Sequence, residues 1–288
     1  MERNTNKGGK SSLTKILTGT PQDAVADVLV NFGELAINPL MDILEDPDIN
    51  VRYSAVRALG KLKAKKAASK IINLFNKETD PRFRGCIVVS LAQIGTDEVR
   101  KPIILAYEEE KDDRVRCLIV TAIGILCDDS SLAILKKALK DTDARVRANA
   151  VEAIARIKGL NPSEFIKQLL KDPNNRVRAN VCKVLWHSDP ETVFNSLKEM
   201  IESEKEMERA SAAYAMGEIA DKRILELLVE RLKVEKASQP REHICEALGK
   251  IGELAMKPLK EVLALENNLN VLFAIQEINR KKRRERKI

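Results

Sequence analysis

The sequence has few aromatic residues, few glycines and only two histidines. Aromatic residues make up 3% of the 288 residues, and twelve glycines and ten prolines are too few for a strand-and-turn protein of this length. Alanine, leucine, lysine, glutamate and arginine, which lose little side-chain freedom in a helix, dominate instead. The composition therefore predicts an all-α fold.

Long apolar runs and paired cysteines are also missing. No stretch of 18 apolar residues occurs, so we expect no membrane span. The first ten residues lack the apolar core of a secretory signal. No Cys-x-x-Cys spacing occurs among the five cysteines, Cys86, Cys117, Cys127, Cys182 and Cys245. Several of them occupy apolar helix positions, which fits a reducing compartment. We expect a cytoplasmic protein.

The net charge of +7 is concentrated at the two ends of the chain. The last nine residues carry +6 and the first 20 carry +3, which leaves −2 for residues 21–279. We expect a flexible basic segment over 1–20, a near-neutral repeat domain over 21–279 and a basic tail over 280–288. The high pI of the whole chain therefore does not indicate a basic fold.

A short motif recurs along the chain, in which an apolar residue precedes an arginine and further apolar residues follow at +3 and +7. Val51, Arg52, Ala55 and Leu59 form one copy. The arginines follow one another at steps of 31 or 32 residues: Arg52, Arg84, Arg116, Arg147, Arg178, Arg209 and Arg241. This spacing indicates a repeat array, with a buried stripe on the first helix of each unit and an amphipathic second helix. Neighbouring units must stack, because one helix pair cannot bury its own face.

Repetition extends beyond the arginines. Residues 33–40 match residues 252–259, so residues 22–45 form an opening unit without the arginine. Residues 269–279 have the pattern of a first helix whose partner is replaced by the basic tail. We predict an α-α superhelix of about eight helix pairs and a terminal helix, with the second helices lining a concave surface.

Residues 46–62, Asp-Pro-Asp-Ile-Asn-Val-Arg-Tyr-Ser-Ala-Val-Arg-Ala-Leu-Gly-Lys-Leu, and their copies resemble HEAT-like repeats. They are most similar to the short repeats of phycobilisome-lyase-type proteins, and the resemblance covers about residues 22–279. It implies a helical solenoid in which the motif arginines and the aspartates before them form a ladder between repeats. The family includes scaffolds, adaptors, chromophore-lyase subunits and a few enzymes, so the resemblance does not specify a function.

Two further positions of the motif have a structural interpretation. Four residues before the arginine stands a short oxygen acceptor suited to capping the first helix: Asp48, Asp80, Asp112, Asp143 or Asn174. Eight residues after it, the residue is small in six of seven copies, which predicts close helix approach. The alternative is that seven regularly spaced guanidinium groups follow phosphates. Capping and a ladder explain why aspartate accompanies arginine, so we favour the structural role.

The one copy without a small residue there, that of Arg178, carries Trp186, the only tryptophan, followed by His187. Two interpretations are open. The tryptophan fills a gap in a locally irregular stack, or Trp186 and His187 form an exposed anchor for a partner, since tryptophan is favoured in binding hot spots.

No catalytic constellation is recognisable in the sequence. HEAT-like hydroxylases bind iron through several His-Glu pairs, whereas this chain has one Glu242-His243 pair in reversed order. HEAT-like DNA glycosylases need aromatic and acidic groups in a basic cleft, and this body has few aromatics. We predict no enzyme activity, no cofactor and no metal site.

The sequence leaves three functions open. The first is a non-catalytic scaffold that binds a protein through the concave face, and the acidic stretch at 199–206 favours a partner with basic features. The second is binding of nucleic acid by the basic residues of the tail: Arg280, Lys281, Lys282, Arg283, Arg284, Arg286 and Lys287. The alternative for these residues is that they only keep the last helix soluble. The third, implied by the resemblance, is a lyase-type subunit acting on a chromophore-carrying protein.

Overall fold

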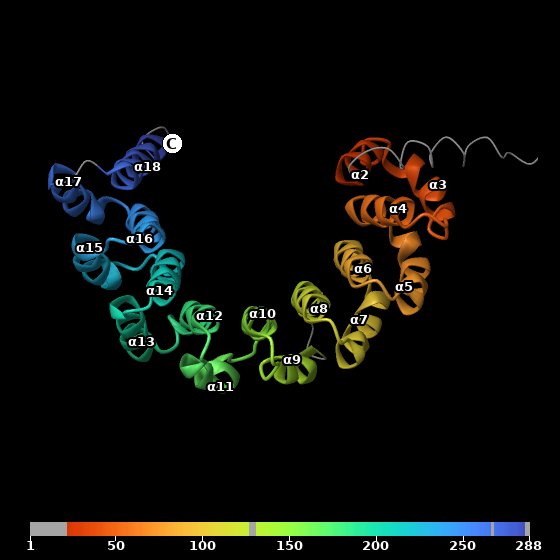
Figure 1. Ribbon diagram of the computed structural model, residues 1–288, viewed down its shortest axis with the longest axis horizontal. Helices are drawn as coiled ribbons and strands as arrows, with labels where there is room; N and C mark the ends of the chain where they lie inside the picture. Colours follow the sequence, from red (N-terminus) through yellow and green to blue (C-terminus); the bar gives the residue numbers. More distant parts are fainter. Residues whose placement is uncertain (1–21, 127–130, 266–267, 286–288) are drawn as a thin grey trace, which may run out of the picture. The chain divides into compact units, whose positions relative to one another are not determined.

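A computed structural model describes residues 22–126, 131–265 and 268–285. All regular structure in these residues is helical, with no strand among them, which confirms the predicted all-α solenoid (Figure 1). The chain divides into two compact units, one ending at Lys158 and the other beginning at Gly159. Each unit is a two-layer stack in which first helices form one layer and second helices the other.

In the first unit, helices of the two layers alternate along the chain. The first helices are α2 (Gln22–Val30), α4 (Ile49–Lys61), α6 (Pro81–Ile94), α8 (Asp113–Ile125) and α10 (Ala144–Ile154). The second helices are η1 (Gly33–Ala36) with α3 (Ile37–Asp42), η2 (Lys65–Ala67) with α5 (Ala68–Lys77), α7 (Asp97–Glu109) and α9 (Leu132–Ala138). Two short helices and two turns together fill the 31- or 32-residue period of the motif, because each helix spans only a few turns.

The second unit continues the alternation. Its first helices are α12 (Asn175–Leu185), α14 (Glu206–Ile219), α16 (Ser238–Ile251) and α18 (Leu269–Glu285). Its second helices are α11 (Ser163–Ile166) with η4 (Lys167–Lys171), α13 (Pro190–Glu202), η5 (Lys222–Ile224) with α15 (Leu225–Val234), and η6 (Glu253–Ala255) with α17 (Met256–Leu265). Along the described chain, each first helix from α2 to α16 precedes a second helix, and α18 ends the series as predicted.

The residue four positions before the motif arginine caps the first helix. Asp112 has an extended backbone, and its side chain accepts hydrogen bonds from the backbone N–H groups of Arg114 and Val115. The other predicted caps accept equivalent bonds: Asp48, Asp80, Asp143 and Asn174. These side chains satisfy backbone donors that have no partner within the helix, so the capping prediction is confirmed.

The apolar stripe of each first helix forms the core of the stack. In α10 the stripe residues Val146, Ala150 and Ile154 are fully buried. The second helix α5 turns Ile71 and Phe75 toward the core from the other layer, and both are buried. The 3.6-residue periodicity read from the sequence therefore defines the buried face of each element.

Neighbouring first helices pack directly on one another, because a small residue eight positions after the arginine lets their backbones approach. A Cβ atom added to Gly60 would lie 2.8 Å from the Cα of Ser90, and one added to Gly124 would lie 2.8 Å from the Cβ of Ala153. Second helices contact one another less. Within each unit the first helices therefore lie on the inner side of the curve (Figure 1). The expectation that second helices line the concave side is wrong, since the closely packed layer is the shorter one.

Candidate binding surfaces

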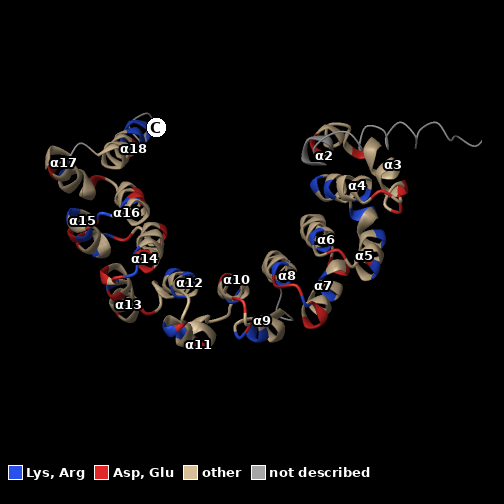
Figure 2. Cartoon of the chain, viewed as in Figure 1, with Lys and Arg blue, Asp and Glu red and all other residues tan. Residues whose placement is uncertain are grey.

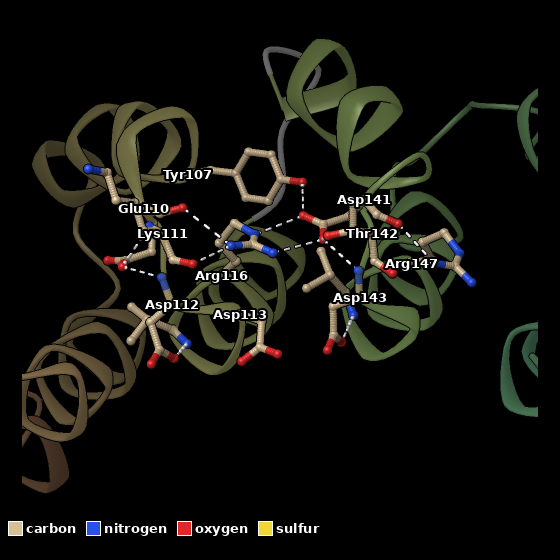
Figure 3. Close-up of polar contacts among 12 residues, drawn as sticks. Tyr107, Glu110, Lys111, Asp112, Asp113, Arg116, Asp141, Thr142, Asp143 and Arg147 are labelled. Atoms are coloured by element: carbon tan, nitrogen blue, oxygen red, sulfur yellow. Dashed lines mark hydrogen bonds and ion pairs between the residues drawn. The ribbon is translucent and has the colours of Figure 1, made fainter.

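The motif arginines form a ladder that is built from backbone as well as side chains. Arg116 on α8 donates from Nε and Nη2 to the two carboxylate oxygens of Asp141, over 2.9 and 3.1 Å. Its Nη1 donates to the carbonyl oxygen of Lys111 at 2.8 Å, in the turn before its own helix. Figure 3 shows Arg116 between these two groups. One guanidinium thus joins its own repeat to the next.

The carboxylate of Asp141 accepts hydrogen bonds from several residues. Besides Arg116, the hydroxyl of Tyr107 donates to it at 2.7 Å, and the backbone N–H of Asp143 donates at 2.9 Å (Figure 3). Burial disfavours the charged form of Asp141, but the hydrogen bonds from Arg116, Asp143 and Tyr107 outweigh it, so its pKa lies below its usual value. Burial also raises the pKa of Tyr107, and the bond to Asp141 raises it further.

The ladder carboxylate lies six residues before the motif arginine of the following repeat. It therefore stands two residues before the capping residue of that repeat. Arg84 pairs with Glu110 at 2.7 Å, and Arg209 pairs with Glu235 at 2.7 Å. Arg52 pairs with Glu78 in the same way, at 3.4 Å. The aspartates that the resemblance placed in the ladder act as helix caps instead, because an N-cap side chain folds back onto the first turn of its own helix.

One step of the ladder departs from this rule, and the sequence explains why. The position six residues before Arg209 is Ser203, which carries no charge. Arg178 pairs instead with Glu208 at 3.1 Å, from the first turn of α14. A carboxylate from a neighbouring position thus replaces the missing one.

The remaining ladder arginines are anchored by backbone carbonyl oxygens. Arg147 donates to the carbonyls of Asp141 and Thr142, at 2.8 and 3.1 Å. Arg241 donates to the carbonyls of Leu232 and Glu235, at 3.0 and 2.8 Å, and is buried. The guanidinium groups of the ladder therefore bond within the stack rather than face a ligand.

Trp186 is not an exposed anchor. Its side chain is 1% exposed, its indole N–H donates to Asp221 at 3.1 Å, and the guanidinium carbon of Arg223 lies 4.6 Å from the ring centroid. The tryptophan comes directly after α12 and packs against the turn that follows α14, so it fills the gap where other repeats have a small residue. The exposed-anchor hypothesis is wrong for Trp186; His187, next to it, is exposed.

The basic tail is largely helical. α18 continues to Glu285, beyond the boundary expected at residue 279, and Figure 2 shows its basic end. Arg280 pairs with Glu277 at 3.2 Å, Lys281 donates to the carbonyl of Gly249 at 3.4 Å, and Lys282 pairs with Glu253. The exposed basic side chains of this end that the structure describes include Arg283 and Arg284; Arg286 and Lys287 lie outside the described residues.

The acidic stretch at 199–206 spans the end of α13, the turn that follows it and the first residue of α14. It therefore lies mainly on the second-helix layer, away from the inner face.

Within the described part of the chain, no group of three or more histidine, cysteine, aspartate or glutamate side chains could hold a metal ion. No described helix is both long and apolar enough to cross a membrane.

The profile of HEAT repeats matches the sequence over residues 37–116, 101–164 and 162–249. The chain belongs to the HEAT-repeat family. No curated protein matches this HEAT-repeat chain.

Several solved structures share the fold of this HEAT-repeat chain. YibA of Escherichia coli is 20% identical, with a TM-score of 0.58, and the match covers 91% of this chain and 98% of YibA. A chain from the complex of CpcE and CpcF of phycocyanin lyase from Nostoc is 18% identical, with a TM-score of 0.52. The match covers 84% of this chain and 94% of that one. The karyopherin Kap121p is 14% identical, with a TM-score of 0.57, and 94% of this chain matches 35% of Kap121p.

Sequence reasoning missed the ladder carboxylates, although their signal is present. An acidic residue stands six positions before six of the seven arginines: Asp46, Glu78, Glu110, Asp141, Asp172 and Glu235. The capping residue two positions later is the more familiar signal, and both recur at the same period. Only the stacking of one repeat on the next distinguishes which carboxylate reaches the guanidinium.

Proposed function

We propose that this chain is a non-catalytic scaffold or adaptor that binds a protein partner through the inner, first-helix side of its helical stack. The observation that supports this is the exposure of apolar and aromatic side chains on two first helices of the second unit, α14 and α18. Met207 and Tyr214 on α14 are 58% and 44% exposed, and Phe273 on α18 is 61% exposed. In a chain with 3% aromatic residues, these side chains are suited to anchoring a partner.

The surroundings of Tyr214 support the same role. The ring of His243 on α16 lies 6.0 Å from the Tyr214 ring, and the Lys183 ammonium on α12 lies 5.5 Å from it. His243 is itself held, since its Nδ1 lies 3.0 Å from the carbonyl oxygen of Ala210. A held aromatic side chain loses little conformational entropy when a partner covers it.

Site-specific photo-crosslinking tests the proposal. A benzoylphenylalanine in place of Tyr214 lies on the inner layer, and the same residue in place of Val234, which is 62% exposed at the end of α15, serves as the matched outer-layer control. We expect a defined protein adduct from position 214 in native cells and none from position 234. Adducts from position 234 alone would contradict binding by the first-helix layer.

Binding of nucleic acid by the end of α18 is a second candidate, favoured by the exposure of Arg283 and Arg284. It predicts a steep salt dependence of binding to duplex DNA, with a slope of about −6 if all seven basic residues contact phosphates. A slope near zero would exclude an electrostatic anchor.

The lyase-type alternative is tested by mixing the chain with a bilin and an acceptor protein and recording visible absorbance. The proposed scaffold role predicts no change.

We also propose a cytoplasmic location, supported by the burial of Cys86, Cys182 and Cys245, none of which forms a disulfide with another described residue.

A further inference from the structure

A hollow of about 270 Å³ opens on the first-helix layer of the first unit, where α4, α6 and α8 meet. Gly85 of α6, which is buried, lies in its lining. A Cβ atom added at Gly85 would lie 2.8 Å from the Cδ1 of Leu118 on α8. The hollow therefore lies beside a close contact between α6 and the Leu118 side chain of α8.

The hollow concentrates positive charge. No acidic residue is among its described lining. Four cationic side chains line it: Arg57, Lys61, Arg82 and Arg114. This contrasts with residues 21–279 as a whole, whose net charge is −2. Like charges gathered around one hollow favour an anionic occupant.

The four cations differ in how far the protein already neutralises them. Lys61 pairs with Asp27, and Arg114 pairs with Asp112 at 3.0 Å. Arg82 is exposed, and no carboxylate of residues 22–126, 131–265 or 268–285 forms an ion pair with it. Arg82 is therefore the cation with most to gain from an incoming carboxylate.

The rest of the lining is apolar or neutral. Val89 is 41% exposed and Leu118 is half-buried, so an aliphatic group finds contacts beside the cations. Ser90 and Gln93 add neutral hydrogen-bonding groups along α6. Tyr53, whose ring lies 5.9 Å from that of Phe83, closes the side formed by α4.

We infer that this hollow binds an acidic segment of the partner protein, in which an aspartate or glutamate side chain stands next to an aliphatic one. Its volume is slightly below the roughly 300 Å³ at which pockets for small molecules begin. That size suits one or two side chains of a peptide. This inference rests on the proposed scaffold function and specifies the chemistry of the partner.

A peptide fits the surroundings better than a nucleic acid. A phosphate backbone needs cations that continue past the hollow, but the next exposed arginine along the layer, Arg145, already pairs with Asp113 at 3.0 Å and Asp143 at 2.8 Å. A phosphate group would gain nothing from the apolar contacts that Val89 and Leu118 offer. The positive charge is local, as recognition of a short acidic peptide requires.

Fluorescence anisotropy on the full chain tests the inference. The probe is a fluorescein-labelled peptide, Asp-Glu-Leu-Asp-Glu-Leu-Asp-Glu, and its matched controls replace every acid by its amide or every leucine by serine. We expect saturable binding of the acidic peptide, no binding of the amide peptide and weaker binding of the serine peptide. Equal binding of the acidic and serine peptides would overturn the inference, because it would show attraction to any anion.

Arg82→Glu locates the site, and Arg176→Glu is its matched control. Arg176 occupies the same motif position on α12, two residues before the arginine, and is likewise exposed, but it does not line the hollow. We expect Arg82→Glu to raise the Kd by about tenfold or more and Arg176→Glu to leave it within about twofold. Arg82→Gln, which keeps part of the aliphatic stem, should give an intermediate Kd, and circular dichroism verifies that each variant is folded.

Equal weakening by Arg82→Glu and Arg176→Glu, or displacement of the peptide by single-stranded oligothymidylate at equal concentration, would assign the binding to general charge and overturn the inference. Crosslinking at position 214 separates this result from the proposed function. A protein adduct there without peptide binding at the hollow would leave the scaffold intact and remove only the acidic-peptide site. Loss of both would remove the scaffold as well.

Discussion

At the scale of single residues, a ladder arginine is held by two kinds of partner at once. Arg209 donates to the carboxylate of Glu235 at 2.7 and 3.0 Å and to the carbonyls of Ser203 and Glu204 at 3.0 and 2.8 Å. Both Arg209 and Glu235 are buried. Removing one partner leaves an uncompensated buried charge, which costs about 3–5 kcal/mol in general. The ladder is therefore a structural feature whose loss affects folding first.

The pH dependence of stability should report on Glu235. Burial opposes its charge, but bonds from Arg209 and Arg231 outweigh burial and lower its pKa from 4.5 to about 2. The unfolded chain binds this proton more readily, so the contribution to stability is present above pH 4.5 and is lost as the pH falls toward 2. At pH 7 we expect Glu235→Gln to lower the free energy of unfolding by on the order of 3 kcal/mol.

Urea unfolding followed by circular dichroism at pH 7 and at pH 3 measures this effect. The difference between the wild type and Glu235→Gln should be smaller at pH 3. Glu230→Gln is the control, because Glu230 is 63% exposed in its pair with Lys233 and should change little at either pH. A Glu235→Gln deficit that is identical at the two pH values would contradict the assignment.

Trp186 provides a second prediction at this scale. Because the side chain is 1% exposed and bonded to Asp221, Trp186→Ala should lower the free energy of unfolding by about 3–5 kcal/mol. His187→Ala, which changes the exposed neighbour, should stay within about 0.5 kcal/mol. Far-ultraviolet circular dichroism is the suitable probe, since the variant has no tryptophan. Equal effects of the two substitutions would show that Trp186 does not hold this turn in place.

At the scale of helices, the contact between successive first helices depends on one small residue per repeat. The same motif position is more crowded in some repeats than in others. A Cβ atom at Gly217 would lie 3.1 Å from the Cα of Ala247, whereas one at Gly249 would lie 3.7 Å from the Cα of Ala274, an ordinary contact distance. The backbone of a neighbouring helix cannot move aside as the end of a flexible side chain can.

Two alanine substitutions at this position should therefore have opposite effects. Gly124→Ala brings its Cβ to 2.8 Å from the Cβ and 3.1 Å from the Cα of Ala153, and we expect a loss of about 1–3 kcal/mol. Gly249→Ala meets no such crowding and should gain up to about 1 kcal/mol from helix propensity. Thermal unfolding of both variants beside the wild type measures the signs. A stabilised Gly124→Ala protein would contradict close packing of α8 on α10.

At the scale of the whole molecule, binding by the helical layers and binding by the basic end of α18 can be separated. Truncation at residue 279 would cut α18, because this helix continues to Glu285 and Lys282 pairs with Glu253. A variant that carries Arg283→Gln and Arg284→Gln and lacks residues 286–288 removes exposed charge and keeps the docked part of the helix. It is therefore a cleaner test than truncation.

We expect this variant to retain the protein adduct formed by benzoylphenylalanine at position 214. If the wild type binds duplex DNA, the variant should show a salt slope that is shallower by about 4, since it lacks Arg283, Arg284, Arg286 and Lys287. Gel-shift assays over a range of salt concentrations measure the slope. Loss of the protein adduct together with DNA binding would assign partner binding to the basic end instead of the first-helix layer.

The repeat, the caps and the small-residue positions could be predicted from the sequence because their causes are local. A 3.6-residue period, an acceptor at the N-cap and a small side chain at +8 each act within one helix or its nearest neighbour. Asp112 and Gly124 were interpretable one repeat at a time, and the structure agrees with both. The all-α fold follows from these local rules together with the regular period.

The polar contacts between residues 25 or more positions apart were decided only by the tertiary structure. The sequence contains Asp141 and Asp143 two positions apart, but only stacking aims the first at Arg116 and the second at its own helix. It contains Trp186 without specifying that Asp221 and Arg223 cover it. The curvature that places first helices on the inner side likewise comes from close backbone packing between repeats, which no single repeat encodes.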